Sequence, residues 1–563
     1  MSSIAKTSYK ISGARAAIDA LYENNVTKVF GYPGGAVLNL YDELYKFDKD
    51  MTHIRTAHEQ NAVHAADGFA RSTGQIGAVI VTSGPGASNT ITGIATAYMD
   101  SVPMIIISGQ VAREQLGKDS FQELDITGIT MSITKANIKV KDIKMVKKSI
   151  YEAIEIALTG RMGPVLVDIP SNIFNSEIDE SEFEKFISNI SLDSIAIDES
   201  EIDKVMRLID ESKRPIFLAG GGIIKANLSE EFRKLAQATM IPVATTLMGL
   251  GSVDSNSKTF IGMCGMHGSV TANKALLNAD LVISIGSRFS DRTIGNGSGL
   301  NDNQRIIHID SDKSEINKNI ESYLDVSGEL KNIVNQIASR MNPTKERYSS
   351  HTAPLREKYE IEKKASKNPI DPFIKVINKE YEDAFIITDV GQHQMWTAQS
   401  YKFKKPRQFV TSGGLGTMGF GIGAAIGTQI GNSGSQSILF IGDGGFRMSF
   451  NEAVTIKERD LNIKIFMIRN NTLGMVRQWQ SLFKDRRFSS TDIADSIDYK
   501  MLINSFGVKH YEINTVEDLE KALEEDKSEN NRQSFYEIKI SSDEYVMPMI
   551  PPGKGLKELI EKA

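Results

Sequence analysis

The same order of segments occurs twice in this chain, at positions far apart. Residues 78–109, AVIVTSGPGASNTITGIATAYMDSVPMIIISG, run from an apolar strand-like segment through a glycine turn and a helix-length segment to a second apolar run. Residues 441–471, IGDGGFRMSFNEAVTIKERDLNIKIFMIRNN, repeat this order. Strands that alternate with helices pair in parallel and are covered by helices on both faces. The pattern therefore predicts an α/β protein built from doubly wound parallel sheets.

Composition divides the chain into three such blocks. A length of 563 residues exceeds what one hydrophobic core supports. We expect a linker in the polar, acid-rich stretch 175–204 and a connector in the charged stretch 340–371. An old duplication explains the likeness of the first and third blocks, and so does independent arrival at one architecture. We predict an N-terminal domain, a central domain, a C-terminal domain and a tail at 1–180, 196–342, 368–550 and 551–563.

Bulk properties exclude several classes of protein. The net charge of −6 and the pI of about 5.9 argue against a nucleic-acid-binding surface. One cysteine, Cys264, excludes an intramolecular disulfide and a cysteine-rich metal site, and it suits a reducing compartment. Residues 1–13 lack the apolar core of a signal peptide, and the glycine-studded stretch 413–431 predicts a packed loop and helix rather than a membrane span. We expect a cytoplasmic protein without a membrane partner.

Small oxygen-bearing side chains follow both strands of the second repeat. Asp443 comes after one apolar run, and Asn470 ends the next. The carboxyl ends of parallel strands meet at one edge of the sheet, which is where such folds bind ligands. Carboxylate and amide oxygens suit Mg²⁺, and glycine amides that open a helix suit a phosphate group. A capped helix and an asparagine turn explain the same residues, so this motif alone leaves both readings open.

Further motifs resemble one enzyme family over nearly the whole chain. The pair GDG and NN is typical of thiamine diphosphate enzymes. The blocks FGYPGGAVLNLYD, AHEQNAVHAADGFAR, VTSGPGASN, DSFQELDITGIT, TDVGQHQMW, SGGLGTMGFG and GMVRQWQ occur in the order known from the catalytic subunit of acetohydroxyacid synthases, also called acetolactate synthases. The resemblance implies a three-domain fold and a carboligase that feeds valine, leucine and isoleucine synthesis. Its substrates are pyruvate and a second 2-oxo acid, either pyruvate or 2-oxobutyrate.

The resemblance also implies where the thiamine cofactor binds. Glu59 matches the glutamate that exchanges a proton with the pyrimidine ring, although a glutamate at a helix start is also favoured by the helix dipole. Gly416 and Met418 match residues that hold the pyrimidine and bend the cofactor. The implied thiamine diphosphate site consists of Glu59, Gln392, His393, Gly416, Met418, Gly444 and Gly445, with Mg²⁺ held by Asp443, Asn470 and the carbonyl of Thr472.

Substrate selection is implied by other positions. The backbone of Gly35 matches an oxyanion donor, and Phe121 and Gln122 match residues on the substrate side. Arg292 matches the cation that holds the second substrate's carboxylate. Trp479 matches the tryptophan that favours 2-oxobutyrate, because a wide aromatic face packs one extra methyl group for roughly 1–3 kcal/mol. Met475 of the same GMVRQWQ block is a further candidate catalytic residue. A plain core or interface tryptophan is the alternative for Trp479.

The motif GSRFSDRTIG, residues 286–295, resembles the flavin-binding motif that distinguishes the biosynthetic enzymes. In this family the flavin has a structural and not a redox role. A surface ladder of Arg and Asp is the alternative for RFSDR alone. The implied FAD site consists of Arg161, Gly221, Gly222, Thr246, Met248, Met266, His267, Gly286, Arg288, Asp291 and Asp310.

The family forms homodimers or dimers of dimers, in which the pyrimidine side of each site comes from one chain and the diphosphate side from its partner. A small regulatory subunit is a further partner that the resemblance allows. Some positions depart from the family pattern. Ser171 stands where a lysine is usual, Arg469 where many members have Asn or Leu, and Ile422-Gly423 where Leu-Pro is common.

Two other functions compete with this interpretation. A pyruvate oxidase uses flavin as an oxidant, but the RFSDR and VRQWQ motifs argue against it. A sensor that retains the fold without catalysis is the second, and the presence of Glu59, Asp443 and Asn470 argues against it.

Overall fold

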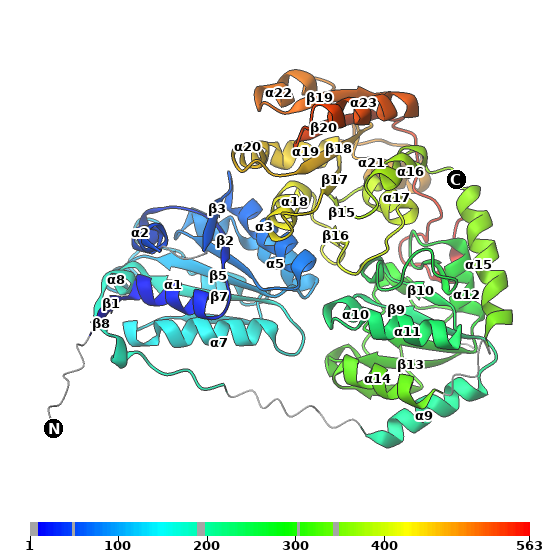
Figure 1. The fold of residues 1–563 in the computed structure, drawn as a ribbon, viewed down its shortest axis with the longest axis horizontal. Helices are drawn as coiled ribbons and strands as arrows, with labels where there is room; N and C mark the ends of the chain where they lie inside the picture. The colour runs from blue at the N-terminus through cyan, green and yellow to red at the C-terminus, as the bar shows by residue number, and fades with distance from the viewer. Residues whose placement is uncertain (1–8, 48–50, 189–197, 301–303, 342–347, 563) are drawn as a thin grey trace.

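The computed structural model describes residues 9–47, 51–188, 198–300, 304–341 and 348–562. The centre of the predicted linker, residues 1–8 of the stretch judged for a signal peptide, and the predicted boundaries at 196 and 342 lie outside these residues. Three parallel six-stranded sheets with helices on their faces make up the fold, as the strand–helix alternation predicts. In Figure 1 the first domain is blue, the middle domain green, and the third domain yellow to red.

The first domain has the strand order β3-β2-β4-β5-β7-β6. Its strand β5 alternates sides, since Ile105 and Ile107 belong to one apolar core and Ile106 to another on the opposite face. The strands are β2 (Lys28–Tyr32), β3 (Thr52–Arg55), β4 (Gly77–Val81), β5 (Met104–Gln110), β6 (Ala136–Lys139) and β7 (Pro164–Pro170). The helices are α1 (Gly13–Glu23), α2 (Leu38–Lys46), α3 (Glu59–Thr73), α4 (Pro85–Ser88), α5 (Ile91–Met99), α6 (Ile126–Thr130), α7 (Val146–Leu158) and α8 (Ser171–Asn175).

The third domain has the order β16-β15-β17-β18-β20-β19. Numbered within each domain, both orders read 2-1-3-4-6-5, so the repeat seen in the sequence extends to the whole topology. The strands are β15 (Phe385–Thr388), β16 (Phe409–Thr411), β17 (Ser437–Gly442), β18 (Ile463–Arg469), β19 (Lys509–Ile513) and β20 (Ser534–Lys539). The helices are α16 (Asp371–Glu380), α17 (Gln392–Ser400), α18 (Phe420–Gly431), α19 (Asp443–Ser449), α20 (Ala453–Glu458), α21 (Gly474–Phe483), α22 (Tyr499–Ser505) and α23 (Val516–Ser528).

The middle domain is wound differently, in the order β11-β10-β9-β12-β13-β14. Numbered within the domain this reads 3-2-1-4-5-6, the order of dinucleotide-binding sheets. The strands are β9 (Pro215–Ala219), β10 (Val243–Thr245), β11 (Phe260–Met263), β12 (Leu281–Ile285), β13 (Arg305–Asp310) and β14 (Leu324–Ser327). The helices are α9 (Glu199–Glu211), α10 (Gly221–Lys225), α11 (Ser229–Thr239), α12 (Val270–Asn278), α13 (Asp291–Ile294), α14 (Leu330–Arg340) and α15 (Ser349–Lys364).

Helices α3 and α18 join the first and third domains, and they lie side by side at the centre of Figure 1. Glycine permits this close approach. A Cβ at Gly68 would lie 2.2 Å from the carbonyl oxygen of Ala424, and a Cβ at Gly427 would lie 1.7 Å from that of Ala65. The glycine-rich stretch is therefore a buried helix and its preceding loop, as predicted. No helix of the described chain is long and apolar enough to span a bilayer.

The two stretches predicted as connections contain regular secondary structure that the sequence did not indicate. The linker stretch contains β8 (Glu177–Asp179), which pairs with β1 (Lys10–Ser12), and it also contains the start of α9. The connector stretch contains α15, a helix of 16 residues that packs against α12. Both stretches look like linkers because few of their residues are buried, which leaves a weak apolar signal. In α15 only Thr352 and Tyr359 are fully buried.

The C-terminal tail packs on the middle domain. Ile550 and Leu556 are buried in the same apolar cluster as Ile216 and Leu218 of β9. An isolated bridge joins Gly295 to Gly555, which places the tail beside the end of the RFSDR motif.

Candidate active site

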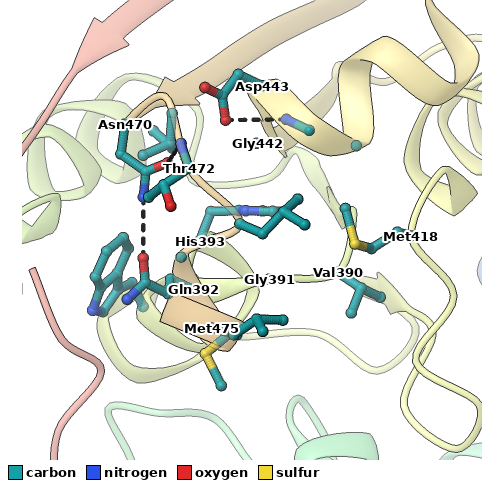
Figure 2. A pocket seen from close by; sticks show the side chains of 17 residues that line it. Val390, Gly391, Gln392, His393, Met418, Gly442, Asp443, Asn470, Thr472 and Met475 are labelled. Atoms are coloured by element: carbon teal, nitrogen blue, oxygen red, sulfur yellow. Dashed lines mark hydrogen bonds between the residues drawn. The ribbon is translucent and has the colours of Figure 1, made fainter. Parts of the chain in front are cut away.

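A pocket opens in the third domain between the carboxyl ends of β15 and β17, where the strand order reverses. Ligands bind at this position in open α/β sheets. Figure 2 shows side chains from several elements converging on it. The lining includes nine predicted residues: Gln392, His393, Met418, Asp443, Gly444, Gly445, Asn470, Thr472 and Met475. It also includes residues that the sequence did not single out, namely Val390, Gly391, Trp396, Gly442, Ile468, Leu473, Gly474 and Val476.

The two strand ends of the second repeat meet in this pocket. The Asp443 carboxylate accepts hydrogen bonds from the backbone N–H of Gly444, at 3.0 Å, and of Asn471, at 2.8 Å. The amide oxygen of Asn470 accepts from the N–H of Thr472, at 3.2 Å. The predicted juxtaposition is therefore present, and the residues proposed to bind the metal share one wall.

The chemistry of this wall fits a divalent cation. Burial raises the pKa of Asp443 above its ordinary value, so a nearby cation would stabilise the ionised form. The described residues contain no cluster of three or more His, Cys, Asp or Glu side chains that could hold a metal. Mg²⁺ needs no such cluster, because it is bound through one or two carboxylates with phosphate oxygens and water completing the shell.

Gln392 and His393, at the start of α17, form the opposite wall. The Gln392 side chain accepts from Asn470 Nδ2, at 3.1 Å, and donates to the carbonyl of Glu544, at 2.7 Å. His393 is buried, and desolvation lowers its pKa to about 4. Its Nε2 is buried with no hydrogen-bond partner among the described residues, although this histidine lines the pocket. An unpartnered nitrogen at this place suits a polar ligand.

Asp389, which the sequence did not mark, organises the loop that carries Met418. Its carboxylate accepts from the backbone N–H groups of Val390, Gly419 and Gly421. The carboxyl group is fully buried, and desolvation raises its pKa to about 6. Its neighbour Gly445 has no room for a side chain, since a Cβ would lie 2.5 Å from Asp389 Oδ1. The signal in the sequence was the position of Asp389 at a strand end, directly after Thr388.

Four of the residues predicted for the thiamine and substrate sites lie in the first domain, away from this pocket: Gly35, Glu59, Phe121 and Gln122. Glu59 follows the N-cap residue His58, whose ring accepts from the N–H of Gln60. The Glu59 carboxylate accepts from Asn89 Nδ2, at 2.9 Å. A Cβ at Gly35 would meet nothing within 4 Å, so its backbone faces open space. None of the four lines the third-domain pocket.

Gln122 completes the first-domain group. A Cβ at Gly84 would approach the Gln122 backbone to 2.9 Å, which brings the DSFQE loop against the end of β4. Phe121 is 88% exposed in the single chain. This group therefore gathers at the β2–β4 strand ends, the position that corresponds to the pocket of the third domain.

Arg292 and Trp479 come together from different domains. The guanidinium group lies 6.0 Å from the centre of the indole ring. Arg292 also donates to the sulfur of Met266, at 2.9 Å. Trp479 lies one helical turn beyond Met475, which lines the pocket, so helix α21 links the pocket lining to Arg292.

The predicted flavin residues cluster at the carboxyl edge of the middle sheet. The segments that follow the carboxyl ends of β9 and β12 are in close contact, since a Cβ at Gly222 would lie 2.7 Å from Gly286 Cα. This is where the strand order of the domain reverses. Met248 lies close to both Gly221 and Gly413. It belongs to the short turn Leu247–Gly249, which Thr246 caps. The flavin loops therefore border the loop that leads to Met418.

Charged and polar side chains surround these loops. Arg288 donates to the carbonyl of Met99, at 2.8 Å, and Arg161 of the first domain pairs with Glu315. Burial raises the pKa of Asp310 at the end of β13. His267 is buried, and its Nε2 has no hydrogen-bond partner among the described residues. Asp291 differs from the rest, because its side chain is 77% exposed and its ion pair, with the Arg292 side chain, spans 3.9 Å.

Comparison with known families covers the three domains in turn. Residues 11–129 match the thiamine pyrophosphate enzyme N-terminal TPP binding domain. Residues 202–337 match the central domain of these enzymes, and residues 389–538 match their C-terminal TPP binding domain.

Individual relatives are similar over their full length. A probable acetolactate synthase large subunit of Methanocaldococcus jannaschii is 41% identical over 98% of this chain and 95% of that protein. The acetolactate synthase large subunit of Lactococcus lactis is 39% identical over 98% and 96%. The acetolactate synthase isozyme 2 large subunit of Escherichia coli is 36% identical over 98% and 100%. This chain therefore belongs to the acetolactate synthase large subunits, a family of thiamine pyrophosphate enzymes.

Proposed function

We propose that this chain is the catalytic subunit of an acetohydroxyacid synthase. It decarboxylates pyruvate and joins the remaining two-carbon unit to pyruvate or to 2-oxobutyrate. The products are 2-acetolactate and 2-aceto-2-hydroxybutyrate, which feed branched-chain amino acid synthesis. The observation that carries the proposal is the third-domain pocket, in which Asp443, Asn470, Gln392 and His393 converge at one reversal of strand order.

Thiamine diphosphate, when bound, supplies the electron sink that decarboxylation of a 2-oxo acid requires. Asp443, Asn470 and the carbonyl of Thr472 would hold Mg²⁺ against the diphosphate. His393 Nε2 would gain the partner that it lacks, and the amides at the start of α19 would face the phosphate oxygens. Met418 would press against the centre of the cofactor and fix its orientation.

Glu59 would hold and transfer a proton at its carboxylate, on the pyrimidine side. It does not line the pocket of its own chain, so the complete site needs a second copy. Several large apolar side chains are exposed on the single chain near these residues, among them Phe121, Leu415 and Met448. An interface that covers them would bring Glu59, Gly35 and Gln122 of one subunit to the pocket of the other.

Arg292 would bind the carboxylate of the second 2-oxo acid, and the indole of Trp479 would pack against its alkyl group. The middle domain would bind FAD, because its strand order and the contact of Gly222 with Gly286 suit a dinucleotide. Arg288 and Arg161 would meet the flavin phosphates, as charge-assisted contacts. A small regulatory subunit would be an additional partner of this large subunit.

Mixing two inactive variants tests whether sites are shared. Glu59→Gln and Asp443→Asn damage opposite halves of the site. In a mixed dimer one site would carry both changes and the other would carry neither. Random exchange of subunits should then restore about a quarter of wild-type activity. If each chain builds its own site, the mixture stays inactive, and that result would overturn the shared site.

Product analysis tests the reaction itself. Purified protein with Mg²⁺, thiamine diphosphate, pyruvate and 2-oxobutyrate should release CO₂ and form both acetohydroxy acids, with no consumption of oxygen. Arg288→Ala should reduce the FAD absorbance that remains after gel filtration. Peroxide formation that exceeds acetolactate formation would instead identify an oxidase, and an absence of CO₂ release would identify a non-catalytic protein.

A further inference from the structure

We propose that Arg469 is a positioning residue that fixes the geometry of the Mg²⁺ clamp, the name used here for Asp443, Asn470 and the carbonyl of Thr472. This inference rests on the proposed function, because it concerns the metal site assigned there. Arg469 is the last residue of β18 and directly precedes Asn470. Its side chain is 11% exposed.

The guanidinium group reaches forward to the loop of the clamp. Arg469 Nε donates to the side-chain oxygen of Asn471, at 2.9 Å. Asn471 has a φ of 54°, in the left-handed region, which costs energy for every residue except glycine. Asparagine tolerates this conformation when its side chain is held locally, and Arg469 supplies that hold.

The left-handed conformation orients the Asn471 backbone toward the first metal ligand. The Asn471 N–H donates to Asp443 Oδ2, at 2.8 Å, while Oδ1 of the same carboxylate accepts from Gly444. A continuous path therefore runs from the Arg469 guanidinium through Asn471 to the Asp443 carboxylate. Its middle member lies between Asn470 and Thr472, the two other residues of the clamp.

Two acidic side chains also bind the Arg469 guanidinium. Arg469 forms short contacts with Glu537 of β20 and with Asp495. Glu537 also contacts the ring of His510, at 2.9 Å. Burial alone would raise the pKa of Glu537, but the hydrogen bonds from His510 and Arg469 bring it below its ordinary value. The guanidinium is thus fixed on three sides, a geometry that arginine's planar fork of donors allows and lysine's single ammonium does not.

A second arginine stabilises the Asp443 side of the clamp by contacts with the segment 494–499, which Arg469 also contacts. Arg447 of α19 donates to the hydroxyl of Tyr499, at 3.1 Å, and to the carbonyl of Ala494, at 2.6 Å. The Arg469 guanidinium lies 5.1 Å from the centre of the Tyr499 ring. The strand end that bears Asn470 and the helix that starts at Asp443 are therefore tied to one support.

The test measures the Mg²⁺ concentration that thiamine diphosphate binding requires, separately from catalysis. Of the two tryptophans in the chain, Trp396 lines the pocket and Trp479 lies one helical turn beyond Met475. Their fluorescence should report the binding of thiamine diphosphate at increasing Mg²⁺ concentration. Arg469→Leu should raise the Mg²⁺ concentration for half-maximal binding by about 10–100-fold, the usual effect of losing a residue that orients a metal ligand. Mn²⁺ binding followed by electron paramagnetic resonance should weaken in parallel.

A second change should repair the first. Glycine adopts a positive φ without steric cost, so Asn471→Gly removes the need for the Arg469 contact. The double variant Arg469→Leu/Asn471→Gly should recover most of the metal affinity that Arg469→Leu loses. A merely structural role for Arg469 predicts no such recovery.

Lys464 offers a matched control, because it lies on the same strand, is buried and pairs with buried Asp526. Lys464→Met should lower stability without changing the Mg²⁺ requirement. Equal effects of the two substitutions, or an unchanged Mg²⁺ requirement in Arg469→Leu, would overturn the inference. If Arg469→Leu fails to fold, Arg469→Lys should shift the requirement in the same direction by less, and a wild-type value would overturn it. A wild type that binds thiamine diphosphate without any divalent cation would remove the proposed Mg²⁺ site, and this inference with it.

Discussion

In the proposed function, Glu59 is the residue on which the proton chemistry depends. It opens α3, and its carboxylate is held by Asn89. Glu59→Gln keeps the size and the hydrogen-bonding oxygen but removes the exchangeable carboxyl proton. We expect product formation to fall at least about 100-fold, within the range that general acid–base groups contribute. The circular dichroism spectrum and melting temperature should stay at wild-type values, and unchanged activity would remove Glu59 from this role.

Trp479 should govern the choice of acceptor. Its indole lies beside the Arg292 guanidinium, one helical turn beyond Met475 of the pocket lining. Trp479→Leu removes a broad apolar face, so the preference for 2-oxobutyrate should fall by about 10-fold or more, the value of one methyl group in a pocket. A competition assay with both acceptors measures this ratio directly. The wild-type product ratio in the variant would contradict the assignment.

Side-chain chemistry at strand ends made part of the site predictable. Asp443 and Asn470 bear oxygen ligands after apolar runs, and parallel pairing brings such ends together. Asp389 and Arg469 act through backbone amides and through a neighbouring loop. Their roles depend on a left-handed residue and on a strand from later in the chain, and neither is visible in local sequence.

At the scale of elements, the crossing of α3 and α18 should tolerate no added atoms. A Cβ at Gly427 would collide with the Ala65 backbone, which cannot move aside as a side chain can. Gly427→Ala should destabilise the protein by about 1–3 kcal/mol or more, despite the better helix propensity of alanine. Thermal unfolding measures the change. Gly434→Ala is the matched control, because a Cβ there meets nothing within 4 Å, and an equal loss in both would refute the packing argument.

The same crossing buries a histidine that should make stability depend on pH. His64 is fully buried beside Phe420, and desolvation lowers its pKa from 6.5 to about 3. Between pH 6.5 and about 3 the unfolded chain therefore holds up to one proton more than the folded chain at this site. Stability falls with decreasing pH in this window, by up to about 1.4 kcal/mol per pH unit for this group.

Melting temperatures between pH 7 and 5 should fall less steeply in His64→Gln than in the wild type. Glutamine does not titrate, so the contribution of this site to the slope disappears. Parallel curves for the two proteins would show that His64 takes no part in the pH dependence.

Some helices and strands can be predicted from their own sequence, and others cannot. Fully buried parallel strands such as β5 and β17 are continuous apolar runs between glycine turns, and they were predictable. Helix α15 was not, because it carries few apolar residues and a proline, and it is stabilised by contacts with α12. Glu362 of α15 caps that helix by accepting from the N–H groups of Val270 and Thr271. Such a contact over about a hundred residues leaves no periodic pattern.

Across the whole molecule, Asp100 joins the three domains. Its carboxylate accepts from the N–H groups of Gly413 and Gly414 and pairs with Arg71, at 3.0 Å. Its carbonyl accepts from Lys225 of the middle domain. Burial lowers the pKa of Lys225 to about 7, and the charge of Asp100 opposes that shift. The loop that leads to Met418 is therefore held by the first domain.

Asp100→Asn should disturb the site at a distance. The amide cannot accept at both positions, and Arg71 loses one of its two buried carboxylate partners while it keeps Asp67. The free-energy cost should therefore stay below about 3–5 kcal/mol, the cost of leaving a buried charge without a partner. The melting temperature should fall, and thiamine diphosphate and FAD should both bind more weakly in equilibrium dialysis. Glu458→Gln is the control, since its ion pair with Arg55 also joins two domains but is exposed. An equal effect of the two substitutions would contradict the role of Asp100.

The tail that packs on the middle domain has a consequence for how the chain matures during synthesis. The last strand of that domain ends at Ser327, yet its apolar cluster is completed by Ile550 and Leu556. Domains fold largely in the order in which they leave the ribosome, so the nascent middle domain presents an uncovered apolar patch while the third domain is being made. The protein is therefore most exposed to aggregation in that interval, and a ribosome that stalls before Ile550 would release a chain with this patch still open.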